Sequence, residues 1–396
     1  MPLRLGYKKS RGGCQRCKKR RVKCDEKQPC TACIKHSVTC SLVEDVQVSP
    51  PPSESRSRSN IPQRMTRASR KSRIVSPTDP FPYFGNRLSL PAAKSVFGET
   101  WTTDLELMHH FTVTTCLTLP RADKLKQIWQ IEVPKSGMEY PFVLHQILVV
   151  AALHLGYLRP NERQRLCLHA SRHQSEGVAG LRKNIANITP ESCEALFSAS
   201  TLLTLSAYAT FSQPKGWLDA AVKPTIGDII DIFSLARGMN QLLACCKEAL
   251  QRGSFSSIFE LQPQTGPTTF LAELVVQLES LRVKISSHAH EDILSREIGW
   301  LISWIQRCSN TTNGPELRIT MTWPIDLSAD YMSLLQQKEP WALTLLAYYC
   351  AVVSTTESTT WYTKNWSMNA LRAITDCLDP AWAPHIAWPS SIIKSL

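Results

Sequence analysis

Apolar side chains recur at helical spacing through most of the chain, beginning near residue 103. Leu105, Met108 and Phe111 follow one another at intervals of three residues. The stretch Thr103–Glu106, which reads Thr-Asp-Leu-Glu, fits a capping box at the start of this pattern. A helix beginning with Thr103 as its N-cap is therefore predicted.

A second helix start stands at residues 189–191. Thr189 is a residue type that suits an N-cap, and Pro190 suits the first helical position. Glu191 places a negative charge at the positive end of the helix dipole. A long buried helix is predicted from Glu191 to about Phe211.

The most apolar stretch of the chain is Phe142–Leu158. It contains two histidines and a glutamine and is bounded by prolines, which favours a buried core helix over a membrane span. Six more segments have helical patterns: Glu162–Ile185, Ile226–Leu250, Phe270–Ser286, Glu291–Arg307, Trp341–Ser354 and Asn365–Leu378. Alternating patterns are scarce, and only short runs such as Leu317–Thr322 favour an extended segment. The pattern predicts an all-α domain over residues 101–396.

Residues 46–100 differ in composition from the helical region. Three prolines at positions 50–52 precede a serine- and arginine-rich run, and five more cations follow by residue 73. Apolar residues before about Pro80 are too few to offset the entropy of ordering the segment. We expect a disordered, basic Ser/Pro-rich linker, which leaves residues 1–45 as a separate small domain.

Charge is distributed unevenly along the 396 residues. Residues 1–80 hold 19 Lys and Arg against 6 Asp and Glu, whereas residues 81–396 hold 26 against 27. The whole net charge of +12 therefore comes from the first fifth of the chain. This asymmetry predicts a nucleic-acid-binding end attached to a neutral globular body.

Six of the 14 cysteines lie between Cys14 and Cys40, and the other eight are scattered. We expect the scattered cysteines to be reduced and buried as small apolar side chains. They are Cys116, Cys167, Cys193, Cys245, Cys246, Cys308, Cys350 and Cys377. The N-terminus is polar and basic and has no apolar leader pattern, so a disulfide interpretation of the clustered six loses its main support.

The clustered cysteines form one spacing unit used twice. Cys-x2-Cys-x6-Cys occurs at Cys14, Cys17 and Cys24, and again at Cys30, Cys33 and Cys40. A structural zinc ion takes four thiolates in a tetrahedron, so two ions need eight where six are present. The symmetric solution is that the first cysteine of each unit bridges both metals. One zinc is then bound by Cys14, Cys17, Cys24 and Cys30, and the other by Cys30, Cys33, Cys40 and Cys14.

The two units differ in charge. Five cations occupy the six positions between Cys17 and Cys24, whereas Lys35 is the only formal charge between Cys33 and Cys40. A helix so dense in cations repels itself, so a polyanion is its expected partner. With six thiolates and two zinc ions counted, residues 1–45 keep a net charge of +6. The first helix is therefore predicted to enter the DNA major groove while the second unit braces it.

The run from Lys9 to Cys30 resembles the fungal zinc-cluster (Zn2Cys6) regulators, including a proline, Pro29, before the fourth cysteine. The resemblance implies a transcription factor that acts in the nucleus, binds double-stranded DNA and reads CGG-type triplets. Its alignment places Arg20 and Arg21 at base-reading positions, and a long cation suits guanine N7 and O6. Lys18, Lys19 and Lys23 are then expected at phosphates. A disulfide framework, or a zinc module that binds only protein, is the alternative.

Residues from about 100 to 390 resemble, more diffusely, the helical regulatory domain of the sterol uptake control subgroup. The resemblance implies a domain that holds a hydrophobic effector. The alternative is a scaffold for dimer or coactivator contacts. The tryptophans and the pair Tyr348-Tyr349 suit either a pocket lining or a core.

No enzyme is predicted from this sequence. Histidines such as His169, His173 and His288 form no metal spacing of the His-Glu-x-x-His kind, and no phosphate-binding loop or nucleophile elbow occurs. Valines and a leucine after Cys40 run straight into Pro50 without a heptad, so the alternatives are a monomer and a homodimer that forms through the helical domain. Target genes and the sign of regulation leave no sequence signal.

Overall fold

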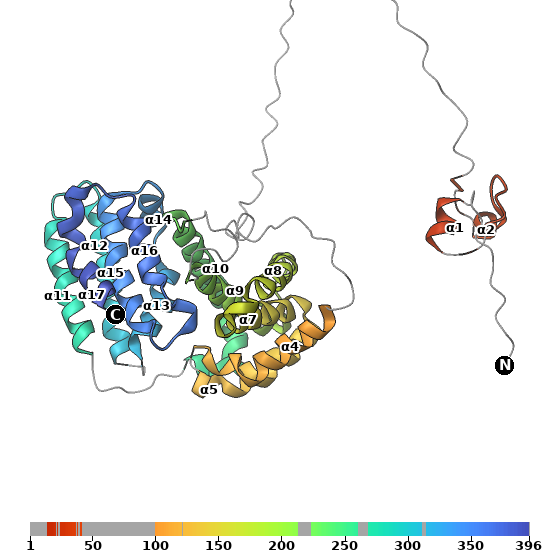
Figure 1. The fold of residues 1–396 in the computed structure, drawn as a ribbon, viewed down its shortest axis with the longest axis horizontal. Coiled ribbons are helices and arrows are strands. Elements are labelled where there is room, and N and C mark those ends of the chain that lie inside the picture. Colours follow the sequence, from red (N-terminus) through yellow and green to blue (C-terminus); the bar gives the residue numbers. More distant parts are fainter. Residues whose placement is uncertain are drawn as a thin grey trace, which may run out of the picture. The chain divides into compact units, whose positions relative to one another are not determined.

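The structure, a computed structural model, describes residues 14–20, 22, 24–36, 38, 40–41, 100–120, 122–212, 223–259, 268–310 and 314–395. The chain divides into two units between Ile74 and Val75. The first unit contains the cysteine-rich segment, and the second contains the helical region (Figure 1). The predicted linker over residues 46–100 lies outside the described residues, apart from its last residue, Thr100.

The second unit is helical, and none of its described residues lies in a strand. Its α-helices are α4 (Thr100–Val113), α5 (Ala122–Gln127), α6 (Val133–Glu139), α7 (Pro141–Leu158), α8 (Arg163–Ile185), α9 (Cys193–Ser212), α10 (Ile226–Arg252), α11 (Thr269–Lys284), α12 (Glu291–Ser309), α13 (Pro315–Thr322), α14 (Ala329–Gln336), α15 (Pro340–Thr356), α16 (Trp366–Thr375) and α17 (Ala387–Ser395). Short helical turns connect them: η1 (Thr115–Thr118), η2 (Ile128–Glu132), η3 (Pro160–Glu162), η4 (Pro190–Ser192), η5 (Ser254–Phe259), η6 (Trp323–Asp326), η7 (Trp361–Thr363) and η8 (Pro380–Ile386). The all-α prediction is confirmed.

Two helices, α7 and α15, form the centre of the unit. Each is apolar on all sides and has almost every side chain buried, as expected of a helix that neighbours surround. α7 packs against α4, α6, α8 and α9, and α15 packs against α13, α16 and α17. In Figure 1 the blue and teal helices α11–α17 lie on one side of the green α10, and α4, α5, α7 and α8 lie on the other.

The helix start at residue 189 is confirmed. Thr189 Oγ1 accepts a hydrogen bond from the Ser192 N–H at 3.4 Å, and Ser192 Oγ accepts one from the Thr189 N–H at 3.0 Å. This reciprocal capping box begins η4, which leads directly into α9. Because the two hydrogen bonds satisfy otherwise free N–H groups, the local sequence alone determines this start.

Two local predictions are wrong. α4 begins at Thr100, so Thr103 lies inside the helix as a buried residue instead of capping it. The run 317–322, predicted as extended, belongs to α13. Gly314, with a left-handed φ of 68°, and Pro315 at the first helical position begin this helix, and Ile319 buries its inward face.

By length and composition alone, α7 and α10 are each apolar enough to cross a membrane. Within the most apolar 18-residue stretch of each helix, 72% is buried inside the protein in α7 and 44% in α10. The packing of α7 fits the core helix predicted for residues 142–158.

Several hydroxyl groups of α9 are satisfied within the helix. Ser198, Thr204 and Thr210 each donate to the backbone carbonyl oxygen four residues earlier, at 2.6 to 2.9 Å. A tyrosine pair then ties α9 to the C-terminal helices, since Tyr208 and Tyr349 place their hydroxyl oxygens 2.9 Å apart. The Tyr349 hydroxyl also donates to the Thr320 carbonyl oxygen at 2.7 Å, so Tyr349 is a core residue.

The prediction of buried, reduced cysteines outside the cluster is correct for six of the eight. Cys245 is exposed and Cys377 is only partly buried, whereas the rest are buried, and all eight are free thiols. Cys245 is exposed because it precedes the buried Cys246 on α10, and adjacent helical positions point in different directions.

A histidine on α7 is buried in its neutral form. His154 is 4% exposed, its Nδ1 lies 2.9 Å from Thr115 Oγ1, and its ring stacks on Trp361 at a centroid distance of 4.8 Å. Burial, with a smaller contribution from His110, lowers the pKa of His154 from 6.5 to about 4. The unfolded chain therefore binds a proton between pH 6.5 and 4 that the folded chain does not.

This depressed pKa predicts that the helical unit loses stability as the pH falls below 6.5. His154 alone should remove about 2 kcal/mol of unfolding free energy between pH 7 and pH 5. All 11 tryptophans follow residue 100, so tryptophan fluorescence in urea reports this unit within the full chain. His154→Phe should weaken the pH dependence by that amount, and His109→Gln, at an exposed position on α4, should not. An unchanged slope in His154→Phe would contradict the assignment.

Candidate metal centre and nucleic-acid interface

Two five-residue helices position the six clustered cysteines. Cys14 is the N-cap of α1 (Gln15–Lys19), and Cys30 is the N-cap of α2 (Thr31–Lys35). Cys17 and Cys33 lie within these helices on the inner side, and Cys24 and Cys40 come from the segments that follow. All six side chains are at most 3% exposed and form a cluster of their own.

The two halves repeat one backbone arrangement sixteen residues apart. The Cys14 N–H points at Cys24 Sγ at 3.4 Å, and the Cys30 N–H points at Cys40 Sγ at the same distance. After each helix the chain closes in the same way: Val22 N–H bonds to the Cys17 carbonyl oxygen at 3.1 Å, and its counterpart Val38 bonds to Cys33 at 3.2 Å. The repeated spacing in the sequence therefore corresponds to a repeated structure.

The sulfur atoms form two overlapping groups of four. Cys14, Cys17, Cys24 and Cys30 make one group, and Cys14, Cys30, Cys33 and Cys40 make the other. Within each group all Sγ atoms lie within 4.8 Å of one another. Cys14 and Cys30 belong to both groups, as the two-metal arrangement requires.

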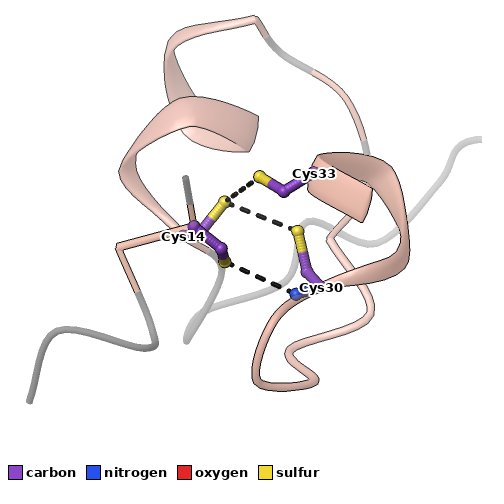
Figure 2. A group of neighbouring side chains, drawn as sticks. Cys14, Cys30 and Cys33 are labelled. Carbon is purple, nitrogen blue, oxygen red and sulfur yellow. Dashed lines mark hydrogen bonds between the residues drawn. The ribbon is translucent and has the colours of Figure 1, made fainter. Parts of the chain in front are cut away.

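The sulfur spacing fits tetrahedral zinc. Cys14 Sγ lies 3.7 Å from both Cys30 Sγ and Cys33 Sγ (Figure 2), and Cys17 Sγ lies 3.7 Å from Cys30 Sγ. A zinc–sulfur bond of about 2.3 Å places the sulfurs of a tetrahedron about 3.8 Å apart. The six cysteines are therefore arranged for a binuclear cluster of two zinc ions per chain.

The electrostatics of the cluster also favour a bound cation. The backbone N–H of Cys17 lowers the pKa of the Cys14 thiol from 9.0 to about 6. Burial, with the neighbouring thiols, raises the pKa of Cys17 and raises that of Cys33 to about 12. Six adjacent buried thiols cannot all ionise without a compensating positive charge. A bound zinc ion supplies that charge and keeps the coordinating sulfurs as thiolates.

An exposed loop joins the two halves. Asp25 accepts a hydrogen bond from the Thr31 N–H at 3.0 Å and a short one from the Thr31 hydroxyl, which together lower the pKa of its carboxyl. The loop also contains Glu26 with a left-handed φ of 57° and a cis peptide bond before Pro29. Asp25 thus places a negative charge at the start of α2, where the helix dipole favours it.

The surface of α1 is basic, but the helix is shorter than the charge run. Lys18 and Lys19 are exposed in its last turn, and Arg20 is its exposed C-cap. Arg21 and Lys23, predicted as DNA contacts, lie outside the described residues. The structure adds one cation, Arg16, which is exposed in the same helix. In the sequence, Arg16 could have been recognised from its position between Cys14 and Cys17 at the start of a helix.

The corresponding surface of α2 is much less charged. Lys35 and the adjacent His36 are exposed there, beside Ile34 with 59% of its surface exposed. Asp25 contributes a negative charge near the start of this helix. The two halves therefore share a backbone arrangement but differ in electrostatic character.

Residues 12–47 match the fungal Zn(2)-Cys(6) binuclear cluster domain. The Zn(2)-C6 fungal-type transcription factor afumD of Aspergillus fumigatus is 26% identical over 375 residues, covering 86% of this chain and 84% of that protein. A Zn(2)-C6 fungal-type transcription factor of Gibberella zeae is 27% identical over 439 residues, covering 99% of this chain and 87% of that protein. Sterol uptake control protein 2 of Candida albicans is 29% identical over 142 residues, covering 36% of this chain and 19% of that protein.

The domain match falls on the segment that carries the two sulfur groups. The first two relatives align across most of the chain, so the similarity includes the helical unit as well as the metal module. The C. albicans protein aligns over a much smaller part. The chain thus carries a fungal Zn(2)-Cys(6) binuclear cluster domain, and its similarity along most of its length to Zn(2)-C6 fungal-type transcription factors makes it a DNA-binding transcription factor.

Proposed function

We propose that this protein acts in the nucleus by placing the basic surface of α1 in the major groove of double-stranded DNA, with α2 bracing the module. The observation that carries the proposal is the arrangement of α1. Its sulfur ligand Cys17 points inward, whereas Arg16, Lys18 and Lys19 are exposed to solvent. Phosphates are the natural partners of such a surface. No catalytic step is part of this function, because its relatives are transcription factors.

Within this interface, Arg20 and Arg21 read the bases of a CGG-type triplet, and Lys18, Lys19 and Lys23 bind phosphates. The exposed position of Arg20 at the end of α1 supports its part in this assignment. Arg side chains bind guanine N7 and O6 with two hydrogen bonds, which is the commonest specific contact. Lysines are compact charges that suit backbone contacts.

We expect Arg20→Ala and Arg21→Ala each to lose about 1–3 kcal/mol of binding on the preferred site and to relax its base preference. Lys18→Ala should instead weaken binding to all duplexes about equally and lower the salt slope by about one unit. Titrations at several salt concentrations, on specific and scrambled duplexes, separate the two effects.

Lys35→Ala is the matched control for these variants, because Lys35 ends α2 as Lys19 ends α1. It should change binding little. If Lys35→Ala were as damaging as Arg20→Ala, the assignment of the groove-reading role to the first half would be wrong.

For the metal ligands, we propose that Cys14 and Cys30 bridge two zinc ions. Cys17 and Cys24 complete one site, and the pair Cys33 and Cys40 completes the other. The membership of Cys14 and Cys30 in both sulfur groups supports this assignment. The module buries little else, so its fold depends on the metal.

Native mass spectrometry of residues 1–45 should show two zinc ions with all six cysteines reduced. Cys30→Ala removes a sulfur from both groups and should abolish both zinc sites. Cys17→Ala leaves the second group intact and should retain one zinc ion. A disulfide-linked form without metal, or equal zinc loss in the two variants, would contradict the bridging assignment. Chelation should unfold the fragment, as circular dichroism would show.

A second proposal concerns the helical unit, which we infer binds an apolar effector. A cavity of about 600 Å³ lies between η1, α9, α10 and α13. Its lining is mainly apolar and includes Leu205, Met239, Leu243 and Met321. Asn240 and Asp326, joined by a hydrogen bond of 3.0 Å, provide a polar patch on the wall. Ligand pockets with this volume and lining suit a small apolar molecule with one polar group.

The effector proposal predicts that lipid copurifies with the protein and that sterols or related lipids raise its Tm. Saturation at about 100 times the Kd stabilises a protein by about 2.7 kcal/mol. Met239→Trp should fill the cavity and abolish both effects. Val276→Trp, at an exposed position on α11, is the control and should keep them. Repeated absence of lipid and of any thermal shift would favour a scaffold role.

Pairing of two chains through the helical domain stays a prediction. The division of the chain into a module over residues 1–45, a linker over 46–100 and a helical domain over 101–396 also stays a prediction.

A further inference from the structure

A second group of metal-ligating side chains lies in the helical unit, far along the chain from the cysteines. It consists of Asp104 on α4 and of His169 and His173 on α8. Their ligand atoms all lie within 4.8 Å of one another, and His173 Nε2 lies 3.0 Å from Asp104 Oδ1. This group has no recognisable spacing in the sequence, because the third ligand comes from a different helix.

We propose that Asp104, His169 and His173 form a site for a divalent transition-metal ion such as zinc, which fastens α4 to α8. His169 and His173 are four residues apart, so they lie one turn apart on the same face of α8. In a tetrahedral zinc site with bonds of about 2.0 Å, nitrogen and oxygen ligands lie about 3.3 Å apart. The His173–Asp104 pair already has nearly this separation, and only the His169 ring has to approach. Water completes such a three-ligand site.

A second histidine supports the orientation of His173. His145 on α7 places its Nδ1 3.0 Å from His173 Nδ1, so the Nε2 of His173 is the nitrogen that faces Asp104. Metal-binding histidines regularly donate their other ring N–H to an acceptor, which fixes the ring and its tautomer. A metal ion at His173 Nε2 would leave the single proton of that neutral ring on Nδ1, which would donate to His145 Nδ1. His145 would then carry its own proton on Nε2, so both rings would stay neutral.

The surroundings suit neutral imidazoles. Burial lowers the pKa of His145, His169 and His173, which favours the uncharged form that binds metals. Arg165, the nearest cation on α8 N-terminal to His169, forms ion pairs with Glu162 at 2.5 Å and with Glu106 at 3.8 Å. Asp104 keeps 35% of its side chain exposed, which leaves a path for the ion to enter.

The position of the site gives it a structural consequence. α4 and α8 are already linked at their surface by the Arg165–Glu106 ion pair. A metal adds a stronger link one turn away. α4 is also the first described helix after the zinc module, so the ion would fix the end of the helical unit that continues toward the DNA-binding segment.

The test counts zinc on the purified full chain by native mass spectrometry with zinc in excess. Wild type should bind three ions per chain, two in the cysteine cluster and one more. Asp104→Asn and His169→Gln should each bind two, and His109→Gln, at an exposed position on α4, should bind three. The proposal rests on the difference in zinc count between wild type and each variant. If the cysteine cluster failed to bind zinc, the count would fall equally in all four proteins and this difference would stay.

A second measurement tests whether a variant loses zinc because it is misfolded. Excess zinc should raise the Tm of the helical unit, followed by tryptophan fluorescence, by about 5 °C in wild type and in His109→Gln. It should leave Asp104→Asn and His169→Gln unchanged, although both unfold cooperatively without added zinc. Two ions on wild type at saturation, or a third ion that the Asp104 and His169 variants retain, would overturn the proposal.

Discussion

Metal–sulfur coordination is the interaction on which residues 14–41 depend. Among the described residues of this segment, the buried side chains are the six cysteines, and the partly buried apolar side chains that pack against them are Ala32 and Val38. Both helices have five residues, far below the length at which an isolated helix is stable in water. The sulfur cluster thus takes the place of a hydrophobic core. The exposed cations of α1 have a defined geometry only while that cluster is intact.

The helical unit is stabilised by the opposite principle, the burial of apolar surface. Most of its helices could be predicted from the sequence because periodic apolar residues and local caps determine them. Phe142–Leu158 and Trp341–Ser354 were recognisable from their apolar character, and the structure places α7 and α15 there at the centre of the packing. Thr189 began its helix as predicted because all its capping partners lie within three residues.

What the sequence could not show depends on contacts between distant segments. The inward face of α13 around Ile319 packs on other helices, and an alternating pattern over six residues does not distinguish this from a strand. The walls of the cavity come from elements far apart in the sequence, from η1 to η6. In the histidine site, His169 and His173 are visible as a helical pair, but Asp104 precedes His173 by 69 residues. The cysteine ligands were predictable for the opposite reason, since all six lie within one short segment.

The sixteen-residue repeat has a consequence for how the module meets a duplex. Two halves with the same backbone offer two docking orientations that shape alone cannot tell apart. Charge removes the ambiguity, because α1 exposes Arg16, Lys18 and Lys19 whereas Asp25 lies at the start of α2. Attraction to phosphates is screened over about 8 Å at physiological ionic strength. For the interface proposed above, we therefore expect the choice of which half faces the DNA to depend on salt, separately from the strength of binding.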